Sequence, residues 1–169
     1  MGRYRPPAPK SSPYITRDGY ERMDDELKAL WKRRAEVTKA LSAAAAEGDR
    51  SENAEYIYRK KELAGIDRRI RYFKKRLPEL TIVDQAPSDA KKVFFGAWVN
   101  LEDADGKQFT YRIVGSDEID MDERYISMDA PLARALFKKS LDEEVRVSTP
   151  KGEARFEILS INYGDKPER

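Results

Sequence analysis

The sequence predicts an α+β protein: a long N-terminal antiparallel helical hairpin followed by a small, mainly antiparallel β-sheet domain with one helix. Three observations support this prediction. Two apolar seams with heptad spacing flank a short turn at Gly48, which is typical of paired helices. A connector containing Pro87 and Ser88 comes next. After it, short alternating runs separated by turn residues favour strands.

The first helix is expected from about residue 17 to about residue 46, with Thr16 as its N-cap. Gly48 suits the C-terminal cap. A helix of about 30 residues is about 45 Å long. The expected seam is Tyr20, Met23, Leu27, Leu30, Arg34, Val37, Leu41 and Ala44, with Arg34 as its one polar member.

The second helix follows the turn and repeats the same spacing. Because the turn is short, the two helices must pack antiparallel. Gly65 is a weak point inside the second helix, and Pro78 should end or kink it. The expected seam is Tyr56, Arg59, Leu63, Ile66, Ile70, Phe73, Leu77 and Leu80.

The C-terminal half reads as strands and one short helix. Asp105-Gly106 and Lys151-Gly152 are turn signals between paired strands. Pro131 suits the first turn of a helix, and Asp129 is a possible cap for it. We expect strands at 93–101, 109–114, 125–128, 145–148 and 154–161, and a helix at 131–139.

Composition narrows the possible chemistry. The 169 residues are 38% charged, with a net charge of only +2, so any basic patch must be local. The chain has no cysteine and no histidine, which excludes disulfides, zinc–thiolate sites and histidine as a general base. Any catalytic or metal-binding role would therefore be carried by carboxylates, which prefer hard cations such as Mg²⁺. With no membrane-length apolar run and no signal peptide, we expect a cytoplasmic protein.

The turn carries two acids, Asp49 and Glu52, three residues apart. One account is structural: Asp49 caps the second helix and Glu52 completes a capping box. The other is chemical. Two carboxylates bind Mg²⁺ weakly by themselves, and a hairpin tip has no pocket. The pair would act only inside another protein's cavity that already holds a metal and a nucleic-acid phosphate.

The second helix also carries a basic side. Lys61, Arg68 and Lys75 recur every seven residues, and Lys60 and Arg71 occupy neighbouring positions. Charge patterning alone is compatible with a solvated helix face. The alternative is a track for a phosphate backbone running toward the tip.

Motifs along most of the chain resemble one family. They are the tip G-D-R-S-E-N-A-E-Y at 48–56, I-D-R-R-I-R-Y at 66–72, K-V-F-F-G-A-W-V at 92–99 and Y-I-S-M-D-A-P at 125–131. Together these motifs resemble the bacterial Gre transcript-cleavage factors, the GreA/GreB family. The F-F-G-A-W stretch and the basic second helix resemble the GreB branch.

The resemblance implies an N-terminal coiled coil and a C-terminal domain similar to FKBP prolyl isomerases. That domain is expected to dock at the rim of the RNA polymerase secondary channel, through Asp129 and Pro131. The coiled coil would then bring Asp49 and Glu52 to the polymerase active site, where they help to bind the second Mg²⁺. The polymerase, rather than this protein, would cleave backtracked RNA. The residues corresponding to a patch that holds the nascent RNA 3′ end are Lys60, Lys61, Arg68, Arg71 and Lys75.

The resemblance implies neither a membrane partner nor a small-molecule substrate. Three rivals stay open: a Gre-like inhibitor of the secondary channel that does not promote cleavage, a prolyl isomerase and a structural coiled-coil adaptor. Residues 1–13 extend beyond the usual start of the family. The expected segments are a basic tail at 1–13, a coiled coil at 14–80 with its tip at 48–55, a linker at 81–92, a docking domain at 93–163 and a tail at 164–169.

Overall fold

A computed structural model of the chain describes residues 7–48 and 53–167. The chain divides into two compact units. The helical unit is Tyr20–Leu80. The sheet unit combines the described residues before Tyr20 with those from Thr81 onward. The structure therefore places residues 14–19 with the sheet unit, whereas the sequence suggested that they belong to the coiled coil.

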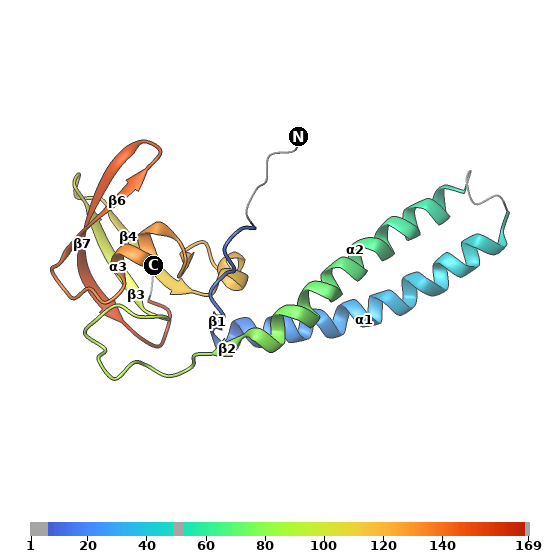
Figure 1. Cartoon of the computed structure of the whole chain (residues 1–169), viewed down its shortest axis with the longest axis horizontal. Helices are drawn as coiled ribbons and strands as arrows, with labels where there is room; N and C mark the ends of the chain where they lie inside the picture. Colours follow the sequence, from blue (N-terminus) through green and yellow to red (C-terminus); the bar gives the residue numbers. More distant parts are fainter. Residues whose placement is uncertain (1–6, 49–52, 168–169) are drawn as a thin grey trace. The chain divides into compact units, whose positions relative to one another are not determined.

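Two long helices form the hairpin. Helix α1 is Arg17–Ala46 and helix α2 is Ala54–Arg76, followed by the 3₁₀ helix η1, Leu77–Glu79. The helices run antiparallel (Figure 1). Pro78 lies in η1, where it ends the α-helix as predicted. The predicted seams are confirmed: Val37, Ile66 and Ile70 form the buried cluster, and Leu27, Leu30 and Leu63 pack against it.

Ion pairs tie the two helices together. Arg34 Nε lies 2.7 Å from Asp67 Oδ1, which gives the one polar position of the first seam a partner. Arg33 pairs with Glu62 at 2.7 Å, and Arg69 pairs with Glu26 at 3.0 Å. Early residues of α1 thus meet late residues of α2, which is the register of an antiparallel pair.

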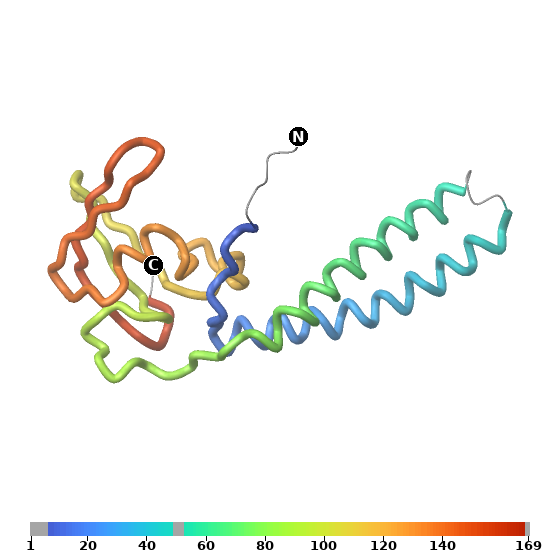
Figure 2. The backbone as a smooth tube through the Cα atoms, viewed as in Figure 1, coloured from blue at the N-terminus to red at the C-terminus, as the bar shows by residue number. Residues whose placement is uncertain are grey.

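The larger sheet of the sheet unit has five strands in the order β5-β4-β3-β7-β6. All neighbouring strands are antiparallel except β4 and β5. The strands are β3 (Trp98–Asp103), β4 (Gln108–Val114), β5 (Tyr125–Ser127), β6 (Glu144–Thr149) and β7 (Gly152–Asn162). The path of the chain through them is traced in Figure 2. The predicted α+β class, with its small sheet and single α-helix, is confirmed.

One core stabilises the sheet unit. Alternating residues of β3, including Val99 and Leu101, are fully buried, as expected for a central strand with one face on the core. Helix α3 (Pro131–Leu136) contributes Ala133 and Leu136. The other members are Val93, Ala97, Ile113, Val145 and Ile158.

A second, two-stranded sheet was not predicted. Strand β1 (Tyr14–Ile15) pairs in parallel with β2 (Thr81–Ile82). Both strands have only two residues, which is too short for an alternating pattern to be recognised. Gly115 allows β1 to approach closely, because a Cβ atom there would lie 2.2 Å from the Tyr14 carbonyl oxygen.

A buried carboxylate holds the start of α1. Glu118, in the 3₁₀ helix η2 (Ser116–Met121), is 0% exposed. It accepts hydrogen bonds from Thr16 N at 2.9 Å, from Gly115 N at 3.0 Å and from the Thr16 hydroxyl. Thr16 Oγ1 in turn accepts from Gly19 N at 3.1 Å, so the predicted N-cap of α1 is confirmed.

Two predicted boundaries and one predicted cap were wrong. The strand expected from residue 93 begins at Trp98, because a turn with Gly96 at φ +86° precedes it. Helix α3 ends at Leu136, before Lys138 adopts a positive φ of 66°. Asp129 does not cap α3, whose N-cap is Ala130 without a side-chain bond.

Candidate functional site

The predicted tip acids, Asp49 and Glu52, lie outside the described residues. The residues on both sides of them are described. Helix α1 ends at Ala46, and Gly48 follows with φ +143°, a conformation that favours glycine. Helix α2 begins at Ala54. The turn between the helices is therefore short, as the sequence indicates.

Asn53 joins the two helix ends. Its side-chain oxygen accepts from Tyr56 N at 3.1 Å, which is the N-cap bond of α2. Its Nδ2 donates to the Ala44 carbonyl at 2.8 Å, and this carbonyl belongs to the last turn of α1, where intrahelical partners run out. One side chain thus satisfies a donor of α2 and an acceptor of α1.

The capping account of the tip acids is therefore wrong. It required Asp49 to be the N-cap of the second helix, but that helix starts five residues later and its cap is Asn53. Sequence reasoning missed Asn53, although asparagine is among the preferred N-cap residues. Glu55, the acid in the first turn of α2, is paired with Arg59 at 2.8 Å.

The five predicted nucleic-acid residues lie on one side of α2. Lys60, Lys61, Arg68, Arg71 and Lys75 are all exposed, and at 100° per residue they fall within an arc of about 100°. The buried residues of α2, such as Ile66 and Ile70, lie on the opposite side. Within the part of the chain that the structure describes, none of the five makes an ion pair.

Other arginines of α2 are committed to carboxylates. Arg59 contacts Glu55 at 2.8 Å and Glu62 at 3.0 Å, and these two acceptors raise its pKa above the ordinary value. Glu62 also binds Arg33, and the hydrogen bonds from Arg33 and then Arg59 lower the pKa of Glu62. The arginines of α2 that pair with carboxylates are therefore distinct from the five exposed cations, which remain available to bind an anion.

The two predicted docking residues flank Ala130 in the sheet unit. Pro131 is exposed at the first position of α3. The Asp129 carboxylate accepts a hydrogen bond from Ser12 N at 2.8 Å and another from the Ser12 hydroxyl. Ser12 lies near the end of the segment expected to be a tail, and Pro13 accepts from Thr81 N at 2.7 Å. These two residues are thus held to the sheet unit.

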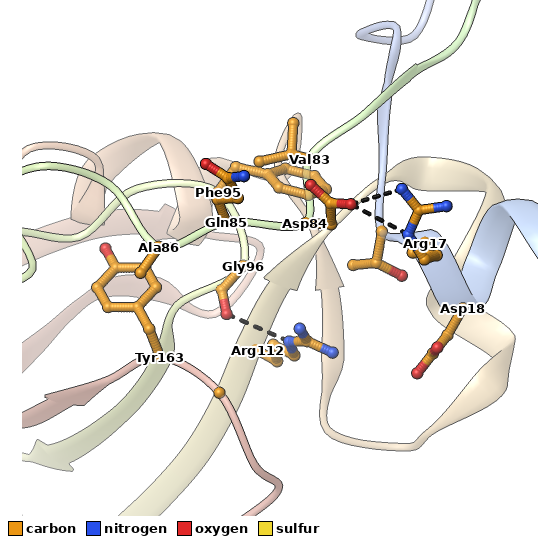
Figure 3. A pocket seen from close by; sticks show the side chains of 12 residues that line it. Arg17, Asp18, Val83, Asp84, Gln85, Ala86, Phe95, Gly96, Arg112 and Tyr163 are labelled. Carbon is orange, nitrogen blue, oxygen red and sulfur yellow. Dashed lines mark hydrogen bonds and ion pairs between the residues drawn. The ribbon is translucent and has the colours of Figure 1, made fainter.

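A pocket of about 290 Å³ lies in the sheet unit (Figure 3). Three of its charged side chains are already engaged: Arg17 pairs with Asp84 at 2.6 Å, and Arg112 Nε donates to the Gly96 carbonyl at 3.2 Å. Phe95 and Tyr163 add aromatic surface. None of the predicted site residues lines this pocket.

Among residues 7–48 and 53–167, no cluster of three or more acidic side chains is placed to hold a metal ion. The helices in these two ranges include none with the length and apolarity that a bilayer span requires.

Both parts of the chain match known families. Residues 13–82 match the family described as transcription elongation factor, N-terminal, and residues 87–163 match transcription elongation factor, GreA/GreB, C-terminal. The transcription elongation factor GreB of Xanthomonas axonopodis pv. citri is 57% identical over 96% of this chain and 98% of its own. The GreB of Pseudomonas aeruginosa is 54% identical, over 99% and 100% of the two chains.

A solved structure is also similar. Thermus aquaticus Gfh1 is 26% identical, covering 92% of this chain and all of its own, with a TM-score of 0.42.

Proposed function

The chain belongs to the GreA/GreB family of transcription elongation factors, and we propose that it makes bacterial RNA polymerase cleave backtracked RNA. In this proposal the hairpin enters the secondary channel of the polymerase in the cytoplasm. Asp49 and Glu52 then complete a metal site next to the RNA 3′ end. The polymerase supplies the active site, and this protein supplies two of its ligands.

The cap of α2 is the observation that carries the proposal. Because Asn53 caps α2 and also binds the end of α1, the turn does not require an acid for the capping role first considered. Glu55 is occupied by Arg59. Asp49 and Glu52 lie in the sequence between Glu47, just after α1, and the paired Glu55, and they are the two acids that we assign to a metal.

The donor chemistry fits Mg²⁺. Carboxylates of ordinary pKa are ionised at neutral pH and offer the hard oxygen ligands that this ion prefers. When bound, the ion would stabilise the charge that develops on the phosphate and help to generate a nucleophile from water. Asp49 and Glu52 would hold it only where phosphate oxygens complete its coordination, so the free protein should not be a nuclease.

Two other surfaces fit the same task. The five exposed cations of α2 offer a path for the displaced RNA backbone, since phosphate contacts supply most nonspecific affinity for nucleic acid. Asp129 and Pro131 are our proposed contacts with the rim of the channel. Ser12 fixes the orientation of the Asp129 carboxylate through two hydrogen bonds.

The test uses a halted, backtracked polymerase complex with end-labelled RNA and Mg²⁺. Wild type should shorten the RNA rapidly, and Asp49→Asn/Glu52→Gln should reduce the rate by about 100-fold or more, the scale seen when charge-stabilising groups are lost. Glu47→Gln is the matched control, because it removes a neighbouring exposed acid at the end of α1. It should cleave as wild type does.

Three further results would count against the proposal. Equal cleavage by the double variant would mean that the acids do not act in the reaction. RNA shortening without polymerase would make the protein a nuclease in its own right. Slower cleavage with wild type than with buffer would establish the rival reading, an inhibitor of the same channel.

A further inference from the structure

Two rows of residues run in parallel along α2. One row, which we call the aromatic row, consists of Tyr58 and Tyr72 with Gly65 midway between them. Lys61, Arg68 and Lys75 form the other, the cationic row. Members of each row are seven residues apart, and each cationic residue follows an aromatic-row residue by three. On an α-helix this spacing makes the rows neighbours along the same side.

This side of α2 faces solvent. Tyr58 is 61% exposed and Tyr72 is 42% exposed. From Lys60 at one edge to Tyr58 at the other, the side spans an arc of about 160°, and no acidic residue of α2 falls within it. The acids Glu55, Glu62 and Asp67 lie at its margins or beyond. An anionic chain laid along this side would therefore meet no like charge from α2.

Each tyrosine ring is backed by an arginine. The Arg59 guanidinium carbon lies 5.5 Å from the Tyr58 ring centre, and that of Arg69 lies 5.4 Å from the Tyr72 ring centre. Arg59 is held by Glu55 and Glu62. Arg69 is held by Glu26 of α1. The rings are thus supported by arginines that α1 and α2 fix in place, which limits the entropy lost when a ligand stacks on them.

Gly65 leaves a gap midway between the two tyrosines. A Cβ atom there would meet only the Arg68 guanidinium, at an ordinary 3.8 Å. Packing against the described residues therefore does not explain a glycine in the interior of a helix, where glycine is unfavourable. Close approach of a ligand to the helix backbone is one of the roles that favour glycine.

From this geometry we propose that α2 carries a base-stacking site for single-stranded RNA. Bases stack on Tyr58 and Tyr72, and the backbone phosphates contact Lys61, Arg68 and Lys75. The tyrosines are about 21 Å apart along the helix axis, so they contact different nucleotides, and the chain between them passes over Gly65. Aromatic side chains beside a cationic groove are the usual means of holding single strands without sequence preference. The choice of RNA as the ligand rests on the proposed function.

The test separates base contacts from phosphate contacts. Binding of the full chain is measured by fluorescence anisotropy with two labelled probes, each about ten nucleotides long, within the range of known single-strand sites. One is single-stranded RNA, and the other is the same sugar–phosphate backbone without bases. Tyr58→Ala and Tyr72→Ala should each weaken RNA binding by about 5- to 100-fold and leave the abasic probe unaffected.

Two controls are matched to the tyrosines. Tyr58→Phe keeps the ring and should bind as wild type does. Ile57→Ala removes an exposed apolar side chain from the same helix, 42% exposed, that cannot stack, and it should change neither affinity. Replacing Lys61, Arg68 and Lys75 together with glutamine should weaken binding of both probes and flatten the salt dependence.

The proposal is overturned if the tyrosine variants bind both probes as wild type does, or if they lose affinity for both probes equally. It is also overturned if Ile57→Ala matches their loss. Helix content and melting temperature, measured by circular dichroism, show that the variants are folded. Because this assay contains no polymerase and leaves Asp49 and Glu52 intact, its failure is distinct from failure of the cleavage test.

Discussion

The helical hairpin and the sheet unit are stabilised in different ways. The hairpin has a narrow apolar seam, in which Val37, Ile66 and Ile70 form one buried cluster, and it adds partly exposed ion pairs between the helices. Among its described residues, the sheet unit has one core cluster in which nine side chains are buried. Next to it lies Glu118, a carboxylate that is fully buried and accepts hydrogen bonds from the backbone and hydroxyl of Thr16, between β1 and α1, and from the backbone of Gly115.

The contrast indicates how each unit can carry function. A hairpin held by one seam leaves the other side of α2 unconstrained by packing, so cations and tyrosines can be placed there at little cost in stability. In the sheet unit polar groups are structural, because each buried one needs its partners. We therefore expect substitutions in the hairpin to change binding more than folding, and substitutions at Glu118 to do the reverse.

The largest effect on folding is expected for Glu118→Ala. It leaves three donors without an acceptor, which should lower the free energy of unfolding of the sheet unit by about 3 kcal/mol. Glu118→Gln keeps one acceptor oxygen and should lose less. Each unit has one tryptophan, Trp31 in the hairpin and Trp98 buried in the sheet unit. Denaturant titration in a Trp31→Phe background therefore reports the sheet unit alone, and a loss below about 1 kcal/mol would show that Glu118 is not an anchor.

Asn53→Ala should have the next largest effect. Loss of its N-cap bond and its bond to Ala44 should destabilise the hairpin by about 1–2 kcal/mol, measured by thermal melting of the helix signal. Asp49→Asn should change the melting temperature very little, because Asn53 is the cap. A larger drop in melting temperature for Asp49→Asn than for Asn53→Ala would indicate that Asp49 is the cap.

Gly65→Ala should act in the opposite direction. Alanine is the better helix residue and meets only Arg68 in the structure, so the hairpin should gain about 0.5–1 kcal/mol. The same change should weaken RNA binding, because it narrows the gap between the tyrosines. Thermal melting measures the stability of the hairpin, and fluorescence anisotropy on the same sample measures the affinity for RNA. A gain in stability with unchanged RNA affinity would show that Gly65 is not part of the RNA-binding site.

The smallest effect concerns pH. Lys166, at 2.5 Å, and then Arg124 hold the pKa of Asp122 well below its ordinary value. A lowered pKa in the folded state stabilises the protein above the unfolded-state pKa, near 4. This contribution is lost as the pH falls below that value toward the folded-state pKa. Asp122→Asn should therefore flatten the acid end of the stability profile of the sheet unit, and an unchanged profile would contradict the assignment.

Much of the fold followed from local sequence patterns. The heptad seams predicted α1 and α2, including Arg34 as a polar member, because neighbours on a helix are close in sequence. Strands β4, β6 and β7 followed from alternation and turn signals. What could not be predicted depends on contacts between distant residues. The β1–β2 pair joins residues 67 positions apart, and Glu118 lies in an acidic stretch that reads as surface.

The candidate site was predictable to a different degree. The five cations of α2 were correctly expected to be exposed on one side, because helical periodicity alone places them. Arg59 pairs with Glu55 and Glu62 of α2 itself, whereas the pairing of Arg69 with Glu26 depends on α1 and could not be predicted from α2 alone. The cap was assigned wrongly because Asp49 and Asn53 both suit an N-cap, and only the observed start of α2 separates them. The metal role of Asp49 and Glu52 stays a proposal.

We propose that the hairpin turn donates metal ligands to the polymerase. The most direct test is an Mg²⁺ titration of RNA cleavage in backtracked complexes, with saturating wild type or Asp49→Asn protein. If Asp49 is a ligand, the variant should need a higher Mg²⁺ concentration for half-maximal rate, about tenfold higher if the ligand contributes about 1.4 kcal/mol. An unchanged Mg²⁺ midpoint, with only the maximal rate reduced, would contradict the claim and leave Asp49 with a role other than metal binding.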